Sequence, residues 1–399
     1  MLTPAEAEKL IGENLLTFLR EDCPLASAHG RILRADLVAD RDLPPFDRVT
    51  MDGYALRSAA LGAGTKTFRI EATQAAGMRA FTLGADDACV EVMTGAVLPE
   101  GADCVVPYED TQQDGRIMKV VTSVAGMPGS AVHRRGSDHR AADVMVRAGT
   151  KLSGREIAVA AAVGASTLVV SAQPKIAVVA TGDELVEVDA SVASHQIRRS
   201  NDHAIRAALI SAGYTRVERF HVRDVRHEIE HRLWHIIAEH DVVLITGGVS
   251  KGKFDFLPSV LDAQGVKKIF HGVAQRPGKP FWFGVTPRRT PVFALPGNPV
   301  SAYTCLHRYV LPALAQASGA KEMSRRLVSL AQPVSFKLPL AYLLPVRLAS
   351  SDHGELLAEP GATNTSGDFG GLVDSDGFVE LPAANADFAA GYVARFFPW

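Results

Sequence analysis

The sequence predicts a multidomain α/β plus β protein. A central α/β domain with a mostly parallel sheet lies between an elongated β-rich N-terminal region and a small C-terminal β-barrel-like domain. The chain has 399 residues, whereas one domain usually needs about 150. Residues 174–322 alternate apolar strand-like runs with helical runs, which indicates βαβ units. The flanking segments contain short apolar runs separated by Gly, Pro and Asp, which is typical of β domains.

The N-terminal region, residues 1–173, is expected to contain two interleaved subdomains. It begins with a helix, since Thr3-Pro4 is a helix start signal and apolar residues follow at helical spacing. We expect this helix to end near Cys23-Pro24.

Short alternating runs at 89–93, 104–108 and 117–121 predict β-strands in the same region, and an alanine-rich stretch at 152–163 predicts a second helix.

The central domain, residues 174–322, repeats the order strand, glycine turn, helix. Its predicted segments are 175–185, 201–213, 216–222, 226–240, 241–250 and 292–314. Residues 323–399 return to short apolar runs with Gly-rich turns, which predict a small β domain.

Composition excludes several functional classes. Hydrophobic residues make up 47% and charged residues 22%, with a formal charge of -2, which is unlike a disordered chain or a nucleic-acid-binding surface. The first twenty residues contain glutamates between the apolar positions, which is unlike a secretory signal. Because no run reaches the roughly 18 apolar residues of a membrane helix, we expect a cytoplasmic protein without a membrane segment.

Four cysteines, Cys23, Cys89, Cys104 and Cys305, are scattered along the chain and never spaced as CxxC. This spacing suggests neither a zinc site nor a disulfide framework. We expect four small buried hydrophobic residues.

Three glycine-rich turns follow predicted strands of the central domain: ATGDEL at 180–185, TGGVSKGKFDF at 246–256 and LPGNP at 295–299. The carboxyl ends of parallel strands share one sheet edge, so these turns are expected to converge. Glycine lets backbone N–H groups approach an anion. Neither a P-loop nor a GxGxxG fingerprint is present, and each turn taken alone is as simply explained as a tight turn.

The stretch RPGKP at 276–280 holds Arg276 and Lys279 on a stiff frame, which suits a phosphate or an oxyanion. A solvated surface turn is the alternative. Asp183, Glu184 and Asp255 are predicted at the same edge, where carboxylates beside an anion call for a hard cation such as Mg²⁺. For Asp183 and Glu184 the alternative is capping of a helix N-terminus.

Three stretches of the N-terminal region are rich in Gly, Asp and Thr: 46–56, 93–110 and 134–140. Asp52 precedes a glycine there, and for this residue taken alone an Asp-Gly turn is the better explanation.

Together these motifs resemble the molybdopterin molybdenumtransferases, the MoeA-type family related to the C-terminal domain of gephyrin. The matching pieces, in order from Pro44 to Tyr303, are PPFDRVTMDGYA, MTGAVLPEGADCVV, GSD, VVATGDELVE, SNDHAI, TGGVSKGKFDF, RPGKPFWFG and LPGNPVSAY. The C-terminal stretch SGDFGGLVDSDGFVELP matches more loosely. Eight pieces in register make the resemblance specific.

The resemblance implies a homodimer of four-domain subunits in which the central domain binds molybdopterin. It implies a molybdopterin molybdotransferase whose substrates are molybdate and adenylylated molybdopterin. The reaction needs Mg²⁺ and releases AMP. The molybdopterin adenylyltransferase and molybdoenzyme apoproteins are the expected protein partners, and no nucleic acid or membrane is expected.

The resemblance also assigns site residues. The candidate catalytic residues are Asp52, Thr94, Asp138 and Asp255. The candidate Mg²⁺ ligands are Asp183, Glu184 and Asp255. The candidate substrate-binding residues are Thr181, Gly182, Glu184, Ser200, Asn201, Gly247, Gly248, Ser250, Arg276, Lys279, Pro296, Gly297, Asn298 and Ser301, with Arg347 and Ser366 from the final domain. The chain departs from the family at Arg276, where a lysine is frequent, and at Lys251, where many members have a small or apolar residue.

Two alternatives stay open. One is the adenylyltransferase that uses the same molybdopterin-binding fold, which is usually a single compact domain of less than half this length. The other is a non-catalytic dimeric scaffold of the gephyrin type. The long β-rich N-terminal region argues against the first, and the retained acidic residues argue against the second.

Overall fold

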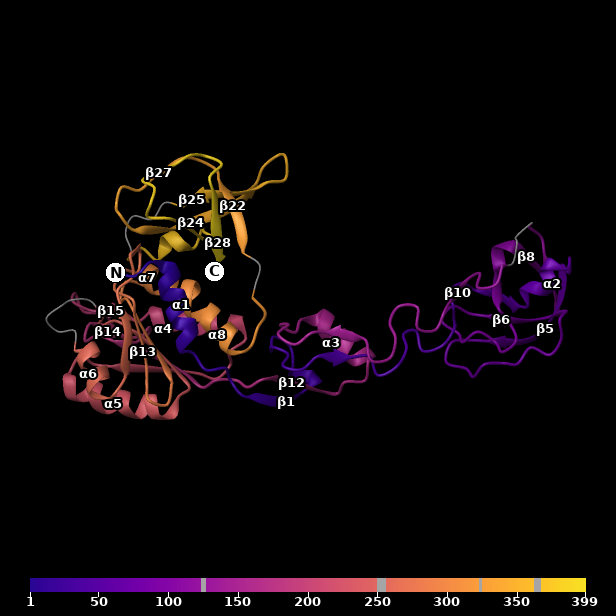
Figure 1. The fold of residues 1–399 in the computed structure, drawn as a ribbon, viewed down its shortest axis with the longest axis horizontal. Helices are drawn as coiled ribbons and strands as arrows, with labels where there is room; N and C mark the ends of the chain where they lie inside the picture. The colour runs from indigo at the N-terminus through magenta and orange to yellow at the C-terminus, as the bar shows by residue number, and fades with distance from the viewer. Residues whose placement is uncertain (123–126, 250–255, 323–324, 362–366) are drawn as a thin grey trace. The chain divides into compact units, whose positions relative to one another are not determined.

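The computed structural model describes residues 1–122, 127–249, 256–322, 325–361 and 367–399. The chain divides into two compact units, and Figure 1 labels part of their helices and strands. Unit 1 comprises Met1–Ala35, Ala148–Ser153 and Thr167–Trp399. Unit 2 comprises Asp36–Arg147 and Gly154–Ser166. The domain boundaries at 173 and 322 stay a prediction.

The centre of unit 1 is a six-stranded sheet of described strands in the order β16-β13-β17-β21-β20-β18. The strands are β13 (Ile176–Thr181), β16 (Val217–Val222), β17 (Val242–Thr246), β18 (Lys267–His271), β20 (Trp282–Val285) and β21 (Pro291–Leu295). β16, β13, β17 and β21 run parallel to one another, while β20 is antiparallel to both β21 and β18. The predicted mostly parallel sheet is confirmed.

Helices cover both faces of this sheet. On one face lie α1 (Pro4–Asn14), α4 (Asn201–Ala212), α7 (Pro299–Cys305) and α8 (Leu311–Ala317), with a π-helical turn, Leu306–Val310, between the last two. On the other face lie α5 (Arg226–Glu239) and α6 (Leu257–Ala263). Side chains along β13 alternate, so that Ile176 and Val178 contact the first group and Ala177 and Val179 contact the second. A strand buried on both faces reads as a continuous apolar run, which is why this sheet is visible in the sequence.

The first helix is shorter than predicted. It begins as expected, because Thr3 and Glu6 form a capping box. It ends at Asn14 rather than near Cys23-Pro24, and β1 (Arg20–Pro24) pairs antiparallel with β12 (Thr167–Ser171) instead. Leu19 is 81% exposed, so the leucine spacing beyond Asn14 does not mark a buried helix face.

The C-terminal part of unit 1 is a closed β-barrel. Its strands are β22 (Arg326–Leu330), β24 (Ala341–Ser350), β25 (Leu356–Pro360), β26 (Gly377–Leu381) and β28 (Val393–Pro398). They are hydrogen-bonded in the order β24-β25-β22-β28-β26, and pairing of β26 with β24 closes the ring. β19 (Gln275–Arg276), which leads into the predicted basic turn, pairs parallel with β24. The barrel-like C-terminal domain is confirmed.

Unit 2 is rich in β-structure, as predicted. Its main sheet has the order β7-β4-β6-β5-β9-β8. The strands are β4 (Gly53–Leu56), β5 (Thr67–Gln74), β6 (Ala88–Val92), β7 (Cys104–Pro107), β8 (Thr111–Asp114) and β9 (Ile117–Val120). Apolar clusters line both faces, since Ala55 and Tyr54, which are adjacent in β4, belong to different clusters.

Shorter elements complete the two units. Unit 2 also contains β2 (Leu37–Val38) paired with β11 (Val144–Val146), β3 (Arg48–Val49) paired with β10 (Val132–His133), and helices α2 (Ser58–Gly62) and α3 (Gly154–Ala162). Unit 1 also contains β14 (Leu185–Val186) paired with β15 (Ile197–Arg198), and β23 (Val334–Ser335) paired with β27 (Asp387–Phe388). Among the described helices, none has the length and apolar character that a membrane span requires.

Candidate active site

The carboxyl ends of β13, β17 and β21 lie side by side, because these parallel strands are neighbours in the central sheet. The Gly247 N–H donates to the Leu295 carbonyl oxygen at 3.2 Å, which ties the turn after β17 to the end of β21. On the other side, a Cβ at Gly247 would lie only 2.6 Å from the Thr181 carbonyl oxygen. The described parts of the three glycine-rich turns therefore converge at one edge, as predicted.

Glycine is required in this turn for conformation as well as for space. Gly247 and Gly248 have φ values of 96° and 65°, in the left-handed region that favours glycine. Thr181, which is 5% exposed, donates from its hydroxyl to the Thr246 carbonyl oxygen at 3.4 Å. Backbone, rather than bulky side chains, forms this stretch of the edge.

The TGDE turn after β13 presents two carboxylates. Gly182 has a φ of 146°, and its carbonyl oxygen accepts a hydrogen bond from His221 Nε2 at 3.0 Å. Asp183 Oδ1 lies 3.4 Å from Arg223 Nε and accepts from the Asp224 N–H at 3.2 Å. Both Asp183 and Glu184 are exposed. A positive charge therefore already lies beside Asp183.

The start of α4 is joined to the third glycine-rich turn. Asn201 Nδ2 donates to the Gly297 carbonyl oxygen at 2.8 Å, and the other amide atom, Oδ1, is buried without a hydrogen-bond partner among the described residues. Ser200 is exposed at the N-cap position. Ser200 and Asn201 therefore lie at the same sheet edge as Gly247.

A buried ion-pair network supports this helix start. Asp202, which is fully buried, accepts through Oδ2 from Arg199 at 2.9 Å and from Arg219 at 3.1 Å. Arg199 also pairs with Glu187 at 2.8 Å. Our sequence reasoning missed this network, although an acidic residue in the first turn of a helix three positions after an arginine was the available signal.

The basic turn at 276–280 is held by a buried side chain and carries two exposed cations. Gln275, which is fully buried, donates through Nε2 to the Pro277 carbonyl oxygen at 3.1 Å and accepts a hydrogen bond from the Tyr309 hydroxyl. A Cβ at Gly278 would lie 2.5 Å from Cys305 Sγ, so the turn packs tightly on α7. Arg276 and Lys279 are exposed. Two cations thus stand on a frame that is fixed by a buried side chain. The role of Gln275 was missed because its partner Tyr309 is 34 positions away in the sequence.

The third glycine-rich turn, LPGNP at 295–299, has an exposed tip and a buried start. Gly297 and Asn298 are exposed, whereas Pro296 is buried. Ser301, in α7, is 4% exposed.

In unit 2, Asp52 and Thr94 form one hydrogen-bonded pair. Asp52 Oδ1 accepts from the Thr94 N–H at 2.6 Å and from the Thr94 hydroxyl at 2.7 Å. The backbone hydrogen bond first, and the hydroxyl second, hold the pKa of Asp52 below its usual value, so this exposed carboxyl stays ionised at neutral pH.

Asp138 belongs to a second polar cluster of unit 2. Its Oδ1 lies 2.8 Å from His133 Nε2, and His133 Nδ1 lies 3.1 Å from Arg48 Nη2. Sequence reasoning identified Asp138 but missed Arg48 and His133, which the pairing of β3 with β10 brings together.

Three family models match the chain in order along its length. The MoeA N-terminal region (domain I and II) matches residues 2–164, the probable molybdopterin binding domain matches residues 177–316, and the MoeA C-terminal region (domain IV) matches residues 328–399. A molybdopterin molybdenumtransferase of Synechocystis sp. is 38% identical, with all of both chains covered. This chain belongs to the molybdopterin molybdenumtransferase family.

Further relatives agree with this assignment. A molybdopterin molybdenumtransferase of Staphylococcus aureus is 30% identical over 92% of this chain and 88% of its own length. The crystal structure of a molybdopterin biosynthesis MoeA protein from Pyrococcus horikoshii is 25% identical, covers both chains fully and has a TM-score of 0.85. The family fold is therefore shared over the whole chain.

Some predicted site residues of this molybdenumtransferase family member are placed elsewhere or not described. Ser250, Lys251, Asp255 and Ser366 lie outside the described residues. Arg347 lies on β24, where its guanidinium donates twice to Glu359 Oε2 of the neighbouring strand, at 3.0 and 2.7 Å. Arg347 is therefore not a free cation, because it forms this surface ion pair with Glu359.

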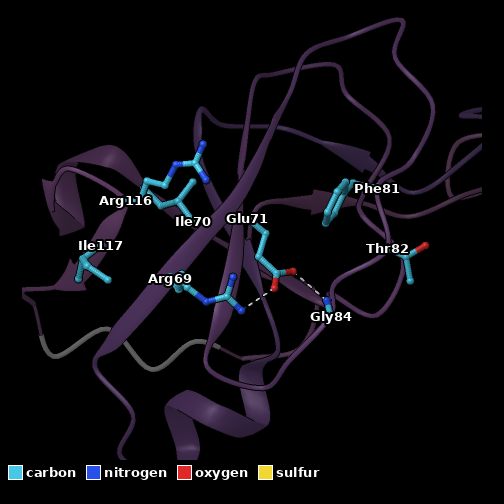
Figure 2. Close-up of a pocket in the computed structure, with 8 residues that line it drawn as sticks. All are labelled: Arg69, Ile70, Glu71, Phe81, Thr82, Gly84, Arg116 and Ile117. Carbon is cyan, nitrogen blue, oxygen red and sulfur yellow. Dashed lines mark hydrogen bonds and ion pairs between the residues drawn. The ribbon is translucent and has the colours of Figure 1, made fainter.

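Unit 2 also has a cavity of about 460 Å³ that contains none of the predicted site residues; its eight lining residues are Arg69, Ile70, Glu71, Phe81, Thr82, Gly84, Arg116 and Ile117 (Figure 2). Glu71 pairs with Arg69 at 2.8 Å and accepts from the Gly84 N–H at 2.9 Å, as the dashed lines in Figure 2 show. The Glu71 carboxylate thus already has partners among the lining residues, so we give this cavity no role in the family reaction.

Proposed function

We propose that this protein inserts molybdenum from molybdate into adenylylated molybdopterin and releases AMP. The observation that carries the proposal is the match over the whole chain to a relative named molybdopterin molybdenumtransferase. The glycine-rich edge of the central sheet supports it, because its backbone can approach an anion closely, and the basic turn supplies exposed cations.

The substrate anions fit the sheet edge and the basic turn. Gly247 and Gly248 are partly exposed and have left-handed φ values, so their backbone can approach a phosphate group, whereas Gly182 is buried. Arg276 and Lys279 supply positive charge from a turn whose frame is held by buried Gln275. We assign these two cations to molybdate or to the terminal phosphate, because a guanidinium binds an oxyanion bidentately and an ammonium acts as a point charge.

The donor set at the TGDE turn fits Mg²⁺ shared between protein and substrate. Mg²⁺ is usually held by one or two carboxylates together with substrate phosphates and water. Glu184 and Asp183 are exposed and adjacent, although Asp183 is partly neutralised by Arg223. No group of three or more His, Cys, Asp or Glu residues within the described ranges could hold a metal by itself. When bound, Mg²⁺ would neutralise phosphate charge; Asp183, Glu184 and Asp255 are its proposed ligands.

Asp52, Thr94, Asp138 and Asp255 remain our proposed catalytic residues. Asp52 stays ionised, since its pKa is lowered, and Thr94 binds Oδ1. Among the described residues Oδ2 has no hydrogen bond, so we assign to it the acceptance of a proton or a hydrogen bond. We also propose a homodimer, with the adenylyltransferase and molybdoenzyme apoproteins as partners. A cytoplasmic location is proposed because all four cysteines are free.

The test is AMP release by the full-length protein incubated with adenylylated molybdopterin, Mg²⁺ and micromolar molybdate. We expect AMP to form only when both molybdate and Mg²⁺ are present, and Asp52→Asn to release less of it than Asp86→Asn, an exposed control in the same unit. Absence of AMP with all components present would refute the proposal. Formation of adenylylated molybdopterin from ATP and molybdopterin would instead support the adenylyltransferase alternative.

A further inference from the structure

A chain of two hydrogen bonds in unit 2 ends on Asp138. Arg48 Nη2 lies 3.1 Å from His133 Nδ1, and His133 Nε2 lies 2.8 Å from Asp138 Oδ1. The antiparallel pairing of β3 with β10 places Arg48 directly opposite His133. Asp138 is tied to the same framework through its backbone, since its N–H donates to the Leu43 carbonyl oxygen at 3.0 Å. The imidazole therefore bridges a strand pair and the proposed catalytic carboxylate.

The donor chemistry of arginine fixes the tautomer of this histidine. A guanidinium has only N–H donors, so Nδ1 of His133 must be the acceptor and carries no proton. A neutral imidazole has one N–H, which is then on Nε2 and donates to Asp138 Oδ1. A proton added at Nδ1 would replace the hydrogen bond from Arg48 by a contact between two cations.

The neighbouring charges have partners of their own. Arg134 pairs with Asp47 at 2.7 Å, and Arg135 pairs with Asp42 at 2.8 Å. Asp47 also accepts from the Arg135 N–H at 2.8 Å. Within the described residues, the His133 ring accepts a hydrogen bond from Arg48 and donates one to Asp138.

We propose that His133, held in its Nε2–H tautomer by Arg48, is a positioning residue that orients Asp138 for the reaction. This inference rests on the proposed function, because it takes Asp138 as a residue that acts on the substrate. The hydrogen bond occupies Oδ1 and leaves Oδ2 without a hydrogen bond among the described residues. The Asp138 side chain as a whole is 52% exposed.

The first test is spectroscopic and does not depend on activity. The full-length protein is labelled with ¹⁵N-histidine, and the two ring nitrogens of His133 are followed at pH 8 by long-range ¹H–¹⁵N correlation. The signal is assigned by its loss in His133→Gln. We expect a protonated Nε2 and an unprotonated Nδ1 in the wild type, and a mixture of tautomers in Arg48→Met. A mixture, or a proton on Nδ1, in the wild type would overturn the inference.

The second test is the rate of AMP release. We expect His133→Ala to lower kcat by about 10-fold to 100-fold with little change in KM, because it misorients a reacting group. His133→Gln keeps an N–H donor of similar reach and should recover most of the rate. His139→Ala, on the same segment, is the matched control and should behave as wild type.

The two tests separate the inference from the proposed function. Unchanged kcat in His133→Ala, or equal loss in the Gln and Ala variants with intact thermal midpoints, would overturn the positioning role while the transferase function stands. A wild-type protein that releases no AMP would remove the function and the positioning role together, whatever the tautomer.

Discussion

Thr94 donates two hydrogen bonds to a single oxygen of Asp52, one from its backbone N–H at 2.6 Å and one from its hydroxyl at 2.7 Å. Asp52 lies directly before β4, and Thr94 follows β6, which pairs with β4. Two of the proposed catalytic residues are thus one structural pair, and the properties of the carboxyl depend on the threonine.

Removing the Thr94 hydroxyl should shift the acid limb of the reaction. The two bonds favour the ionised carboxyl, so its pKa is lowered and Asp52 stays charged to lower pH than an ordinary aspartate. Thr94→Val deletes the second-largest cause of that lowering and keeps the larger one, the backbone bond. We expect the acid limb of the kcat/KM profile for AMP release to move to higher pH in Thr94→Val and to stay in place in Thr94→Ser. Superimposable profiles for Thr94→Val and wild type would show that ionisation of Asp52 does not limit the rate.

The cysteines should be unreactive in the native protein. All four described cysteines are free and buried, as the sequence predicts, and burial raises the pKa of Cys89 and of Cys104 to about 12. The thiolate is the reactive form, so at pH 8 we expect no reaction with Ellman's reagent in the native state and four thiols after denaturation. Rapid native labelling would contradict this burial.

The same two thiols, Cys89 and Cys104, predict that the stability of the protein falls as pH rises. Because their pKa is raised on folding, the unfolded state loses thiol protons first, and stability falls as pH rises above the ordinary thiol pKa of about 8.5. The midpoint of urea unfolding, followed between pH 7.5 and 10, should decrease more in the wild type than in a Cys89→Ala/Cys104→Ala variant. A parallel decrease in both proteins would assign the effect to other groups.

Gly247 and Gly297 provide a matched pair at the sheet edge. A Cβ at Gly247 meets the Thr181 carbonyl oxygen at 2.6 Å with φ at 96°, whereas a Cβ at Gly297 has its nearest contact at 3.7 Å, with Gly247 Cα. We expect Gly247→Ala to lower stability by about 1–3 kcal/mol through backbone strain and Gly297→Ala to leave it within about 0.5 kcal/mol. Urea unfolding of both variants measures the difference. Equal stabilities would mean that the turn after β17 can move away from Thr181.

The glycine-rich sheet edge could be predicted because local sequence patterns mark both the strands and the turns that follow them. Buried parallel strands are continuous apolar runs, and glycine after each strand marks the turn, so Thr181, Gly247 and Gly297 come together by topology alone. The end of α1 was mispredicted because spacing cannot distinguish exposed leucines from buried ones. Pairs such as Arg48 with His133, which are 85 positions apart, depend on strand pairing that no local pattern encodes.

For the same reason, no local pattern predicted the buried arginine that joins the barrel to the central domain. Arg308, 1% exposed, pairs with Glu380 of β26 at 2.6 Å and with Glu8 of α1 at 2.9 Å. Desolvation opposes its charge, but the interactions with Glu380, then Tyr309 and then Glu8 overcome this, so the pKa of Arg308 is raised above its ordinary value. The guanidinium also lies 4.8 Å from the ring centre of Phe397. These partners come from three distant parts of the sequence.

Removing one of these partners should destabilise unit 1 strongly. Glu380→Gln leaves a buried cation whose remaining carboxylate partner among the described residues, Glu8, is partly exposed, and we expect a loss of about 3 kcal/mol. Glu359→Gln breaks the surface pair with Arg347 and is the control; it should leave the thermal midpoint nearly unchanged. Because a buried ion pair often contributes little beyond apolar packing, the double variant Arg308→Met/Glu380→Gln should be more stable than Glu380→Gln alone. Differential scanning calorimetry measures the stability of all three variants. If the double variant is less stable than Glu380→Gln, Arg308 stabilises the junction between the barrel and the central domain through the packing of its side chain rather than through its charge.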